Sequence, residues 1–331
     1  MTNRLSRATP WILPSVTLST RAQTFGNPLL GFDEQFYLLV GDRMAHGGAL
    51  PFIDIFDRKP VGLFLIYAAT RLLGREGTLQ YQLVAAVFAF ATALVIAGVA
   101  RRFADGAGAL AGAIAYLVWL ALLSGEGGQA PVFYNLPVLL AAAATMRLVG
   151  RDDAPSIRAG ASPMLLVGLA MQIKYTVLFE GMFLGLALLV AGHRAGRSTG
   201  RSIVTAAAWI AVALAPTFAA WAVYASIGHG GEFVFANFVS QWGRLSDPLA
   251  TGALGLFRIA GILAPLLVCA ALPPAEAGAS RELRFIQMWL AAAIAGVLVM
   301  HSFPSPHYGL PLLAPAAIAA TPRLGVGARG G

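Results

Sequence analysis

The sequence predicts an all-α, polytopic membrane protein with about ten transmembrane helices. Hydrophobic residues make up 58% of its 331 residues and charged residues only 11%, and the mean hydropathy is +0.72. Basic residues lie mainly between the apolar runs, as the positive-inside rule requires of membrane helices. These observations exclude an ordinary soluble domain. We expect residues 1–331 to form a single transmembrane domain.

The net charge of +8 raises the question of nucleic-acid binding. The positions of the basic residues are already explained by the orientation of membrane helices, so no nucleic-acid partner is expected. The single cysteine, Cys269, lies within an apolar run and excludes an intrachain disulfide. Arg4 and Arg7 occur near the N-terminus without a clear small-residue cleavage site, so no cleavable signal peptide is expected.

The first apolar run, residues 8–20, is short for a span, and a first outer loop of residues 21–77 follows it. Apolar residues at helical spacing predict an amphipathic helix there, ended by two glycines at 47–48. The apolar run of residues 61–73 suits an interfacial or re-entrant helix. The apolar face of the first of these helices is expected to consist of Phe32, Phe36, Leu39, Val40 and Met44.

The rest of the chain alternates between apolar runs and short polar segments. Lys174 separates two apolar runs that are each short for a span, which predicts a tilted or broken helix there. A second outer loop, residues 228–252, carries Phe233, Phe235, Phe238 and Trp242 and predicts another interfacial helix. The expected spans after the first loop cover residues 78–100, 106–124, 131–149, 162–173, 175–191, 202–227, 253–272, 285–300 and 309–321.

A cytoplasmic N-terminus places most basic residues inside, as the positive-inside rule prefers. The same orientation gathers the polar residues that could bind a substrate or take part in a reaction on the outer face, where ATP and nucleotide sugars are absent. We expect a multi-pass protein of the bacterial plasma (inner) membrane with its active site on that outer, periplasmic face. The residues placed there are Asp33, Glu34, Asp54, Asp57, Lys59, Glu126, Gln129, Lys174, Glu180, His301 and His307.

The candidate reactive groups each have a structural alternative. Lys59 and Lys174 are the two lysines of the chain; an ammonium group can hold a phosphate, or Lys174 can snorkel to the interface. Asp33 or Glu34 can act as a general base, or both can stabilise the start of a helix. Asp54 and Asp57 can instead form turns. No zinc, Walker A or dinucleotide-binding motif is present.

Three motifs stand out when the polar segments are taken in order. The first combines Asp33-Glu34 with residues 48–54, GALPFID, and 57–60, DRKP. The second is residues 168–174, GLAMQIK, and the third is His307-Tyr308 with Pro311. Together they resemble the glycosyltransferase C superfamily, and within it the bacterial mannosyltransferase-like branch with the lipid A aminoarabinose transferases and protein O-mannosyltransferases. Phe52 and Val61 stand where the family pattern has a tyrosine and a second proline. The chain ends one helix after the third motif, where family members commonly continue.

The resemblance implies a multi-span helical bundle that transfers a sugar from a polyprenyl-phosphate donor to an acceptor hydroxyl, with inversion. Asp33, with Glu34 beside it, would be the catalytic carboxylate, and Lys59, Arg58 and Lys174 would bind the donor phosphate. Substrate contacts would come from Asp54, Glu126, Gln129, His307 and Tyr308. The acceptor would be a lipid, a glycan or a protein, and membrane lipids would surround the chain.

Three questions stay open at this point. Asp33, Glu34 and Asp54 offer oxygen ligands, so a divalent metal is compatible with the sequence. A transporter of an anionic solute or lipid, with Lys174 and Glu180 as its intramembrane charges, is the main alternative to an enzyme. The second alternative is a shortened member of the family that keeps the fold but is inactive.

Overall fold

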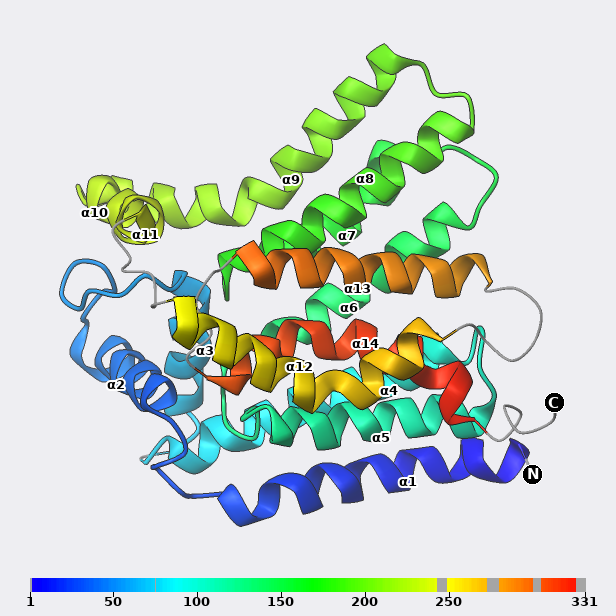
Figure 1. Ribbon diagram of the computed structural model, residues 1–331. Coiled ribbons are helices and arrows are strands. Elements are labelled where there is room, and N and C mark those ends of the chain that lie inside the picture. The colour runs from blue at the N-terminus through cyan, green and yellow to red at the C-terminus, as the bar shows by residue number, and fades with distance from the viewer. Residues whose placement is uncertain (1, 75, 243–248, 273–279, 300–304, 326–331) are drawn as a thin grey trace. The chain divides into compact units, whose positions relative to one another are not determined.

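The computed structural model describes residues 2–74, 76–242, 249–272, 280–299 and 305–325 (Figure 1). Helices account for almost all regular structure in these ranges, and no strand occurs within them. One isolated β-bridge joins Pro51 to Ile55. The all-α fold class is therefore confirmed.

The chain forms two compact units, and the sequence passes between them more than once. The first unit comprises Met1–Gln23, Ala86–Glu126 and Asp247–Gly331. The second comprises Thr24–Ala85 and Gly127–Ser246. The second unit contains the greater part of both predicted outer loops, whereas the third sequence motif belongs to the first unit.

The first unit is built around α14, which packs against α5, α12 and α13, while α1 packs against α5. Gly108 and Gly112 of α5 permit close contact with α14, because a Cβ atom on Gly112 would lie 2.9 Å from the Ala317 carbonyl oxygen. Small residues four positions apart commonly allow membrane helices to approach in this way. The helices are α1 (Thr2–Arg21), α5 (Gly106–Leu122), α12 (Leu249–Ala271), α13 (Arg281–Val299) and α14 (Leu310–Leu324), with most of α4 (Thr78–Ala100).

The second unit contains the paired helices α2 and α3 and a group formed by α6, α7, α8 and α9. In this group α7 packs against α6, α8 and α9 (Figure 1). The bounds are α2 (Phe32–Gly47), α3 (Val61–Arg71), α6 (Ala130–Val149), α7 (Ile157–Met171), α8 (Leu178–Arg194) and α9 (Thr199–Ser226). The second outer loop forms α10 (Gly230–Val234), a π-helical turn (Phe235–Val239) and α11 (Ser240–Trp242).

Six helical segments of the described chain are long and apolar enough to cross a membrane. The break at Lys174 is confirmed, because α7 ends at Met171 and a 3₁₀ turn, Tyr175–Val177, precedes α8. Three further apolar helices, α3, α5 and α7, are shorter. The expected total of about ten spans therefore stays a prediction. The six segments are Thr78–Ala100, Ala130–Val149, Tyr175–Arg194, Thr199–Ser226, Thr251–Ala271 and Arg281–Val299.

The residues of the expected apolar face of α2 divide between exposed and buried positions. Phe32 is 98% exposed and Leu39 is 50% exposed, whereas Val40 is 1% exposed. The face that packs against the protein carries Glu34, Tyr37, Leu38 and Gly41, with Val40 beside it. In a lipid environment an exposed apolar side chain is not penalised as it is in water, so the amphipathic pattern does not identify the packed side of a membrane helix.

Candidate functional site

The first turn of α2 holds two carboxylates in different environments. Glu34 is 2% exposed, and its Oε2 accepts a 2.8 Å hydrogen bond from Nε2 of Gln129 at the start of α6. Gly127 makes room for this carboxylate, since a Cβ atom there would lie 2.7 Å from Glu34 Oε1. Asp33 is only half-buried. Glu34 is thus fixed inside the protein, while the neighbouring Asp33 remains accessible.

Tyr37 lies one helical turn after Asp33, at the centre of the acidic group. Burial raises the pKa of its hydroxyl well above the ordinary value, and the negative charges of Asp33, Asp57 and Glu34 raise the pKa further. A hydrogen bond that the hydroxyl donates to Asp33 acts in the same direction. Tyr37 therefore stays protonated at neutral pH and serves as a hydrogen-bond donor to the accessible carboxylate.

Lys59 reaches the same tyrosine from the loop before α3. Its Nζ lies 5.2 Å from the centroid of the Tyr37 ring, within the range of a cation–π interaction. The backbone N–H of Lys59 donates a 2.6 Å hydrogen bond to Asp57 Oδ1, which fixes the turn before Pro60. The structure therefore brings together Asp33, Glu34, Asp57 and Lys59 around one buried aromatic ring.

A direct backbone contact joins the segments that carry the two lysines. The N–H of Leu63, in the first turn of α3, donates a 3.2 Å hydrogen bond to the carbonyl of Gln172. Gly62 allows this approach, because a Cβ atom there would lie 2.6 Å from that carbonyl oxygen. Lys174 follows in extended conformation, with φ −157°. Lys59 and Lys174 thus lie only a few residues from the same junction between α3 and the end of α7.

Aromatic side chains of the second outer loop cover the first outer loop. Phe52 packs against Phe233 with ring centroids 5.6 Å apart and against Tyr224 of α9 at 5.4 Å. Phe56 and Phe235 are 6.2 Å apart. The Gln241 amide also donates a 3.1 Å hydrogen bond to the Arg58 carbonyl. These contacts hold the loop that carries Lys59 in a defined position.

The remaining aspartates of the first loop stabilise local structure. Asp54 is exposed, and its Oδ2 accepts a 2.8 Å hydrogen bond from the N–H of Leu50. Asp57 fixes the turn described above. Within the residues that the structure describes, no group of three or more His, Cys, Asp or Glu side chains could hold a metal ion. Asp33, Glu34 and Asp54 therefore do not form such a group of three.

Three predicted site residues, Glu126, His307 and Tyr308, belong to the first unit, and their surroundings are described within that unit. Buried Arg21 at the end of α1 donates hydrogen bonds to the carbonyls of Gly125 and Glu126, at 2.6 and 2.7 Å. The ring of His307 stacks on Tyr308 with centroids 4.7 Å apart. His301 lies outside the described residues.

Sequence reasoning missed Tyr37 and Tyr67. Tyr37 lies four residues after Asp33 and three after Glu34, so it shares their side of a helix; that spacing could have identified it. The hydroxyl of Tyr67 donates a 2.8 Å hydrogen bond to the Gly128 carbonyl, and its ring lies 5.5 Å from that of Tyr37. No pattern in the sequence indicates that Tyr67 contacts a segment 61 residues away.

No protein-family model matches the sequence, and no curated protein matches it. Solved structures do match the fold. ArnT from Cupriavidus metallidurans, solved with bound undecaprenyl phosphate, superposes with a TM-score of 0.68 at 17% identity. The match covers 97% of this chain and 60% of ArnT.

A second match is the archaeal oligosaccharyltransferase AglB from Archaeoglobus fulgidus, in complex with an inhibitory peptide and a dolichol-phosphate. It has a TM-score of 0.47 at 11% identity and covers 95% of this chain and 49% of AglB. The chain thus spans less than two thirds of either protein. At the level of the fold, the ArnT match confirms the resemblance that the three motifs indicated: this chain has an ArnT-like fold.

Proposed function

We propose that the protein transfers a sugar from a polyprenyl-phosphate donor to the hydroxyl group of an acceptor at the outer face of the membrane. The observation that carries this proposal is the pairing of an accessible carboxylate, Asp33, with a buried one, Glu34, which Gln129 holds at 2.8 Å. Two lysines near one helix junction supply positive charge for a phosphate. The likeness in fold to an ArnT structure that contains undecaprenyl phosphate supports the same class of donor.

In the proposed reaction Asp33 accepts the proton of the acceptor hydroxyl as its oxygen attacks the anomeric carbon of the sugar. The bond between that carbon and the phosphate oxygen breaks, and its electron pair stays with the phosphate. Attack opposite the leaving group inverts the anomeric centre. Lys59 and Lys174 stabilise the negative charge that develops on the phosphate, as placed cations do for other leaving groups. The Tyr37 hydroxyl orients the Asp33 carboxylate.

The environments of the two carboxylates decide their roles. A general base must reach its substrate, and Glu34 is buried and already bonded to Gln129. Glu34 is therefore a positioning residue that fixes the first turn of α2. Asp33, one residue earlier and half-buried, is the catalytic group in this proposal.

The Asp33→Asn variant tests the assignment, because it removes basicity while preserving the size of the side chain and an oxygen that can accept the hydrogen bond from Tyr37. We expect transfer to fall by roughly two to four orders of magnitude, the usual contribution of a general base, with an unchanged thermal midpoint. The assay follows release of undecaprenyl phosphate from undecaprenyl-phosphate-linked mannose, glucose and aminoarabinose in membranes that supply lipid, glycan and protein acceptors. Exposed Asp153, mutated to Asn, provides the matched control.

The outcomes distinguish a transferase from an inactive relative and from a transporter. Wild-type transfer that persists in Asp33→Asn would contradict the catalytic role of this carboxylate. Binding of the donor without any transfer by the wild type would indicate an inactive relative. Passage of an anion or lipid across reconstituted vesicles, without cleavage of the donor, would indicate a transporter. Glu34→Gln should lower the thermal midpoint as well as the rate, because it changes a buried hydrogen-bonded group.

A further inference from the structure

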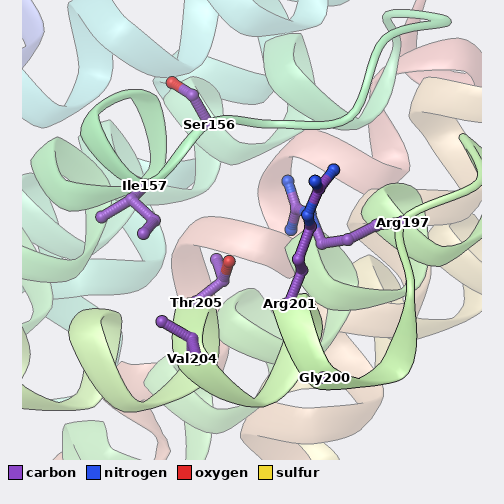
Figure 2. Close-up of a pocket in the computed structure, with 7 residues that line it drawn as sticks. All are labelled: Ser156, Ile157, Arg197, Gly200, Arg201, Val204 and Thr205. Carbon is purple, nitrogen blue, oxygen red and sulfur yellow. The ribbon is translucent and has the colours of Figure 1, made fainter.

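We propose that a pocket where α7 and α9 begin and α8 ends binds the phosphate headgroup of an anionic phospholipid. The pocket has a volume of about 370 Å³ (Figure 2). It is distinct from the candidate active site: α9 has 28 residues and a bend near Pro216, its axis follows a path of about 42 Å at 1.5 Å per residue, and Tyr224, which packs on the first outer loop, is near its far end. The lining residues are Ser156, Ile157, Arg197, Gly200, Arg201, Val204 and Thr205.

Arg197 is held rigidly in this pocket. Its Nη2 donates a hydrogen bond to the Pro155 carbonyl, and its Cζ lies 5.9 Å from the Trp209 ring centroid. Trp209 is 2% exposed and donates a 2.9 Å hydrogen bond to the Ile157 carbonyl. Gly192 leaves space for the guanidinium, since a Cβ atom there would lie 2.6 Å from Nη1. That Nη1 is buried and has no hydrogen-bond partner among the described residues, so the protein compensates the charge of this guanidinium only in part.

Arg201 adds a second guanidinium to the same pocket. Figure 2 shows its side chain extending beside that of Arg197. Within the described ranges neither arginine forms a salt bridge. The acids of the adjoining α6–α7 loop, Asp152 and Asp153, are exposed and do not line the pocket. Two neighbouring positive charges repel each other, and a phosphate group between them would remove that repulsion and accept charge-assisted hydrogen bonds from both.

The apolar part of the lining favours a lipid over a soluble phosphate. Ile157 and Val204 line the pocket and are 44% and 62% exposed. Only 11% of the apolar window of α9 is buried within the protein, against 61% for α6, so α9 offers apolar surface to acyl chains next to the two arginines. Basic pockets between membrane helices are a recognised type of site for anionic headgroups.

Lipid binding to the purified full-length protein tests the proposal. Dioctanoyl phosphatidylglycerol is titrated into the detergent-solubilised protein, and bound lipid is counted by native mass spectrometry. We expect Arg201→Gln to weaken binding about tenfold, because one charge-assisted contact is lost. Arg194→Gln is the matched control, since Arg194 is exposed at the end of α8 and does not line the pocket; its affinity should stay within about twofold of wild type.

Two further ligands distinguish the source of the phosphate. Dioctanoyl phosphatidylcholine should bind at least about tenfold more weakly than phosphatidylglycerol, and inorganic phosphate should not displace the bound lipid at millimolar concentration. Equal binding of the zwitterionic lipid, or equal weakening by Arg194→Gln, would overturn the proposal. Saturable, Arg201-dependent binding of inorganic phosphate in place of phosphatidylglycerol would overturn the lipid assignment in favour of a soluble ligand.

Discussion

The two ends of α9 are associated with charged groups in opposite ways. Near its C-terminal end, Tyr224 packs on the first outer loop, where Glu34 is bonded to Gln129 and Lys59 lies over Tyr37. At its N-terminal end, Arg197 and Arg201 share an open pocket and form no salt bridge in the described structure. In the first region the protein itself supplies the partners of its charges, whereas in the second it leaves room for an external anion.

This difference matches what each region must do under our proposals. Transfer chemistry depends on groups held within a fraction of an ångström, so partners inside the protein are needed to fix them. Headgroup binding depends mainly on unneutralised charge at the membrane boundary, where lipids arrive laterally. The measurements below test whether the two ends really differ in this way.

The largest expected effect is an all-or-none difference in accessibility from outside the cell. With Cys269 replaced by alanine, Ala49→Cys in the first outer loop should react with an impermeant thiol reagent in intact cells. Ser198→Cys, exposed beside the arginine pocket, should react only after the membrane is opened. The reason is that the axis of α9 follows a path of about 42 Å, bent near Pro216, against a hydrocarbon core of roughly 30 Å. Labelling of both residues in intact cells would contradict an arrangement on opposite faces.

Two glycine substitutions, one beside Glu34 and one in the first turn of α9, should change the thermal midpoint of unfolding differently. Gly127→Ala places a Cβ atom 2.7 Å from Glu34 Oε1, whereas a Cβ atom on Gly200 would have no neighbouring atom within 4 Å. Overpacking commonly costs about 1–3 kcal/mol, so we expect Gly127→Ala to lower the thermal midpoint in detergent. Gly200→Ala lies in the first turn of α9 and should be neutral or stabilising by up to about 1 kcal/mol. Equal midpoints for both variants would contradict the tighter packing around Glu34.

The smallest expected effect is a pH-dependent change in stability from the ion pair between Asp42 of α2 and Arg71 of α3. A hydrogen bond from Arg71, with Nε 2.8 Å from Asp42 Oδ1, holds the pKa of the Asp42 carboxyl below its usual value. Because the folded pKa is lower than the unfolded one, this pair stabilises the fold above about pH 4, and the stabilisation is lost as the pH falls through the folded pKa.

Comparison of wild type with Arg71→Met tests this linkage. The difference between their thermal midpoints should be largest near pH 6 and should shrink towards about pH 3. A difference that is constant over this range would show that Arg71 contributes by packing alone. Surface ion pairs contribute little to stability, so the shift should be smaller than the effect of Gly127→Ala.

Sequence predicted well the features that depend on local pattern. The span at residues 78–100 and the break at Lys174 follow directly from apolar runs and their interruption. The packed face of α2 was not predicted, because Phe32 and Leu39 have the same hydropathy whether they face protein or lipid. The pairing of Glu34 with Gln129, 95 residues away, was also out of reach: sequence placed both on the outer face but carried no information about contact between them.

The hydrogen bond between Leu63 and Gln172 also bears on how far such a sequence can diverge. It joins two backbone groups, so exchange of either side chain leaves the donor and the acceptor in place. Gly62 is the sterically restricted position there. The junction that brings the two lysine-bearing segments together can therefore survive extensive amino-acid replacement, provided that position 62 keeps a glycine.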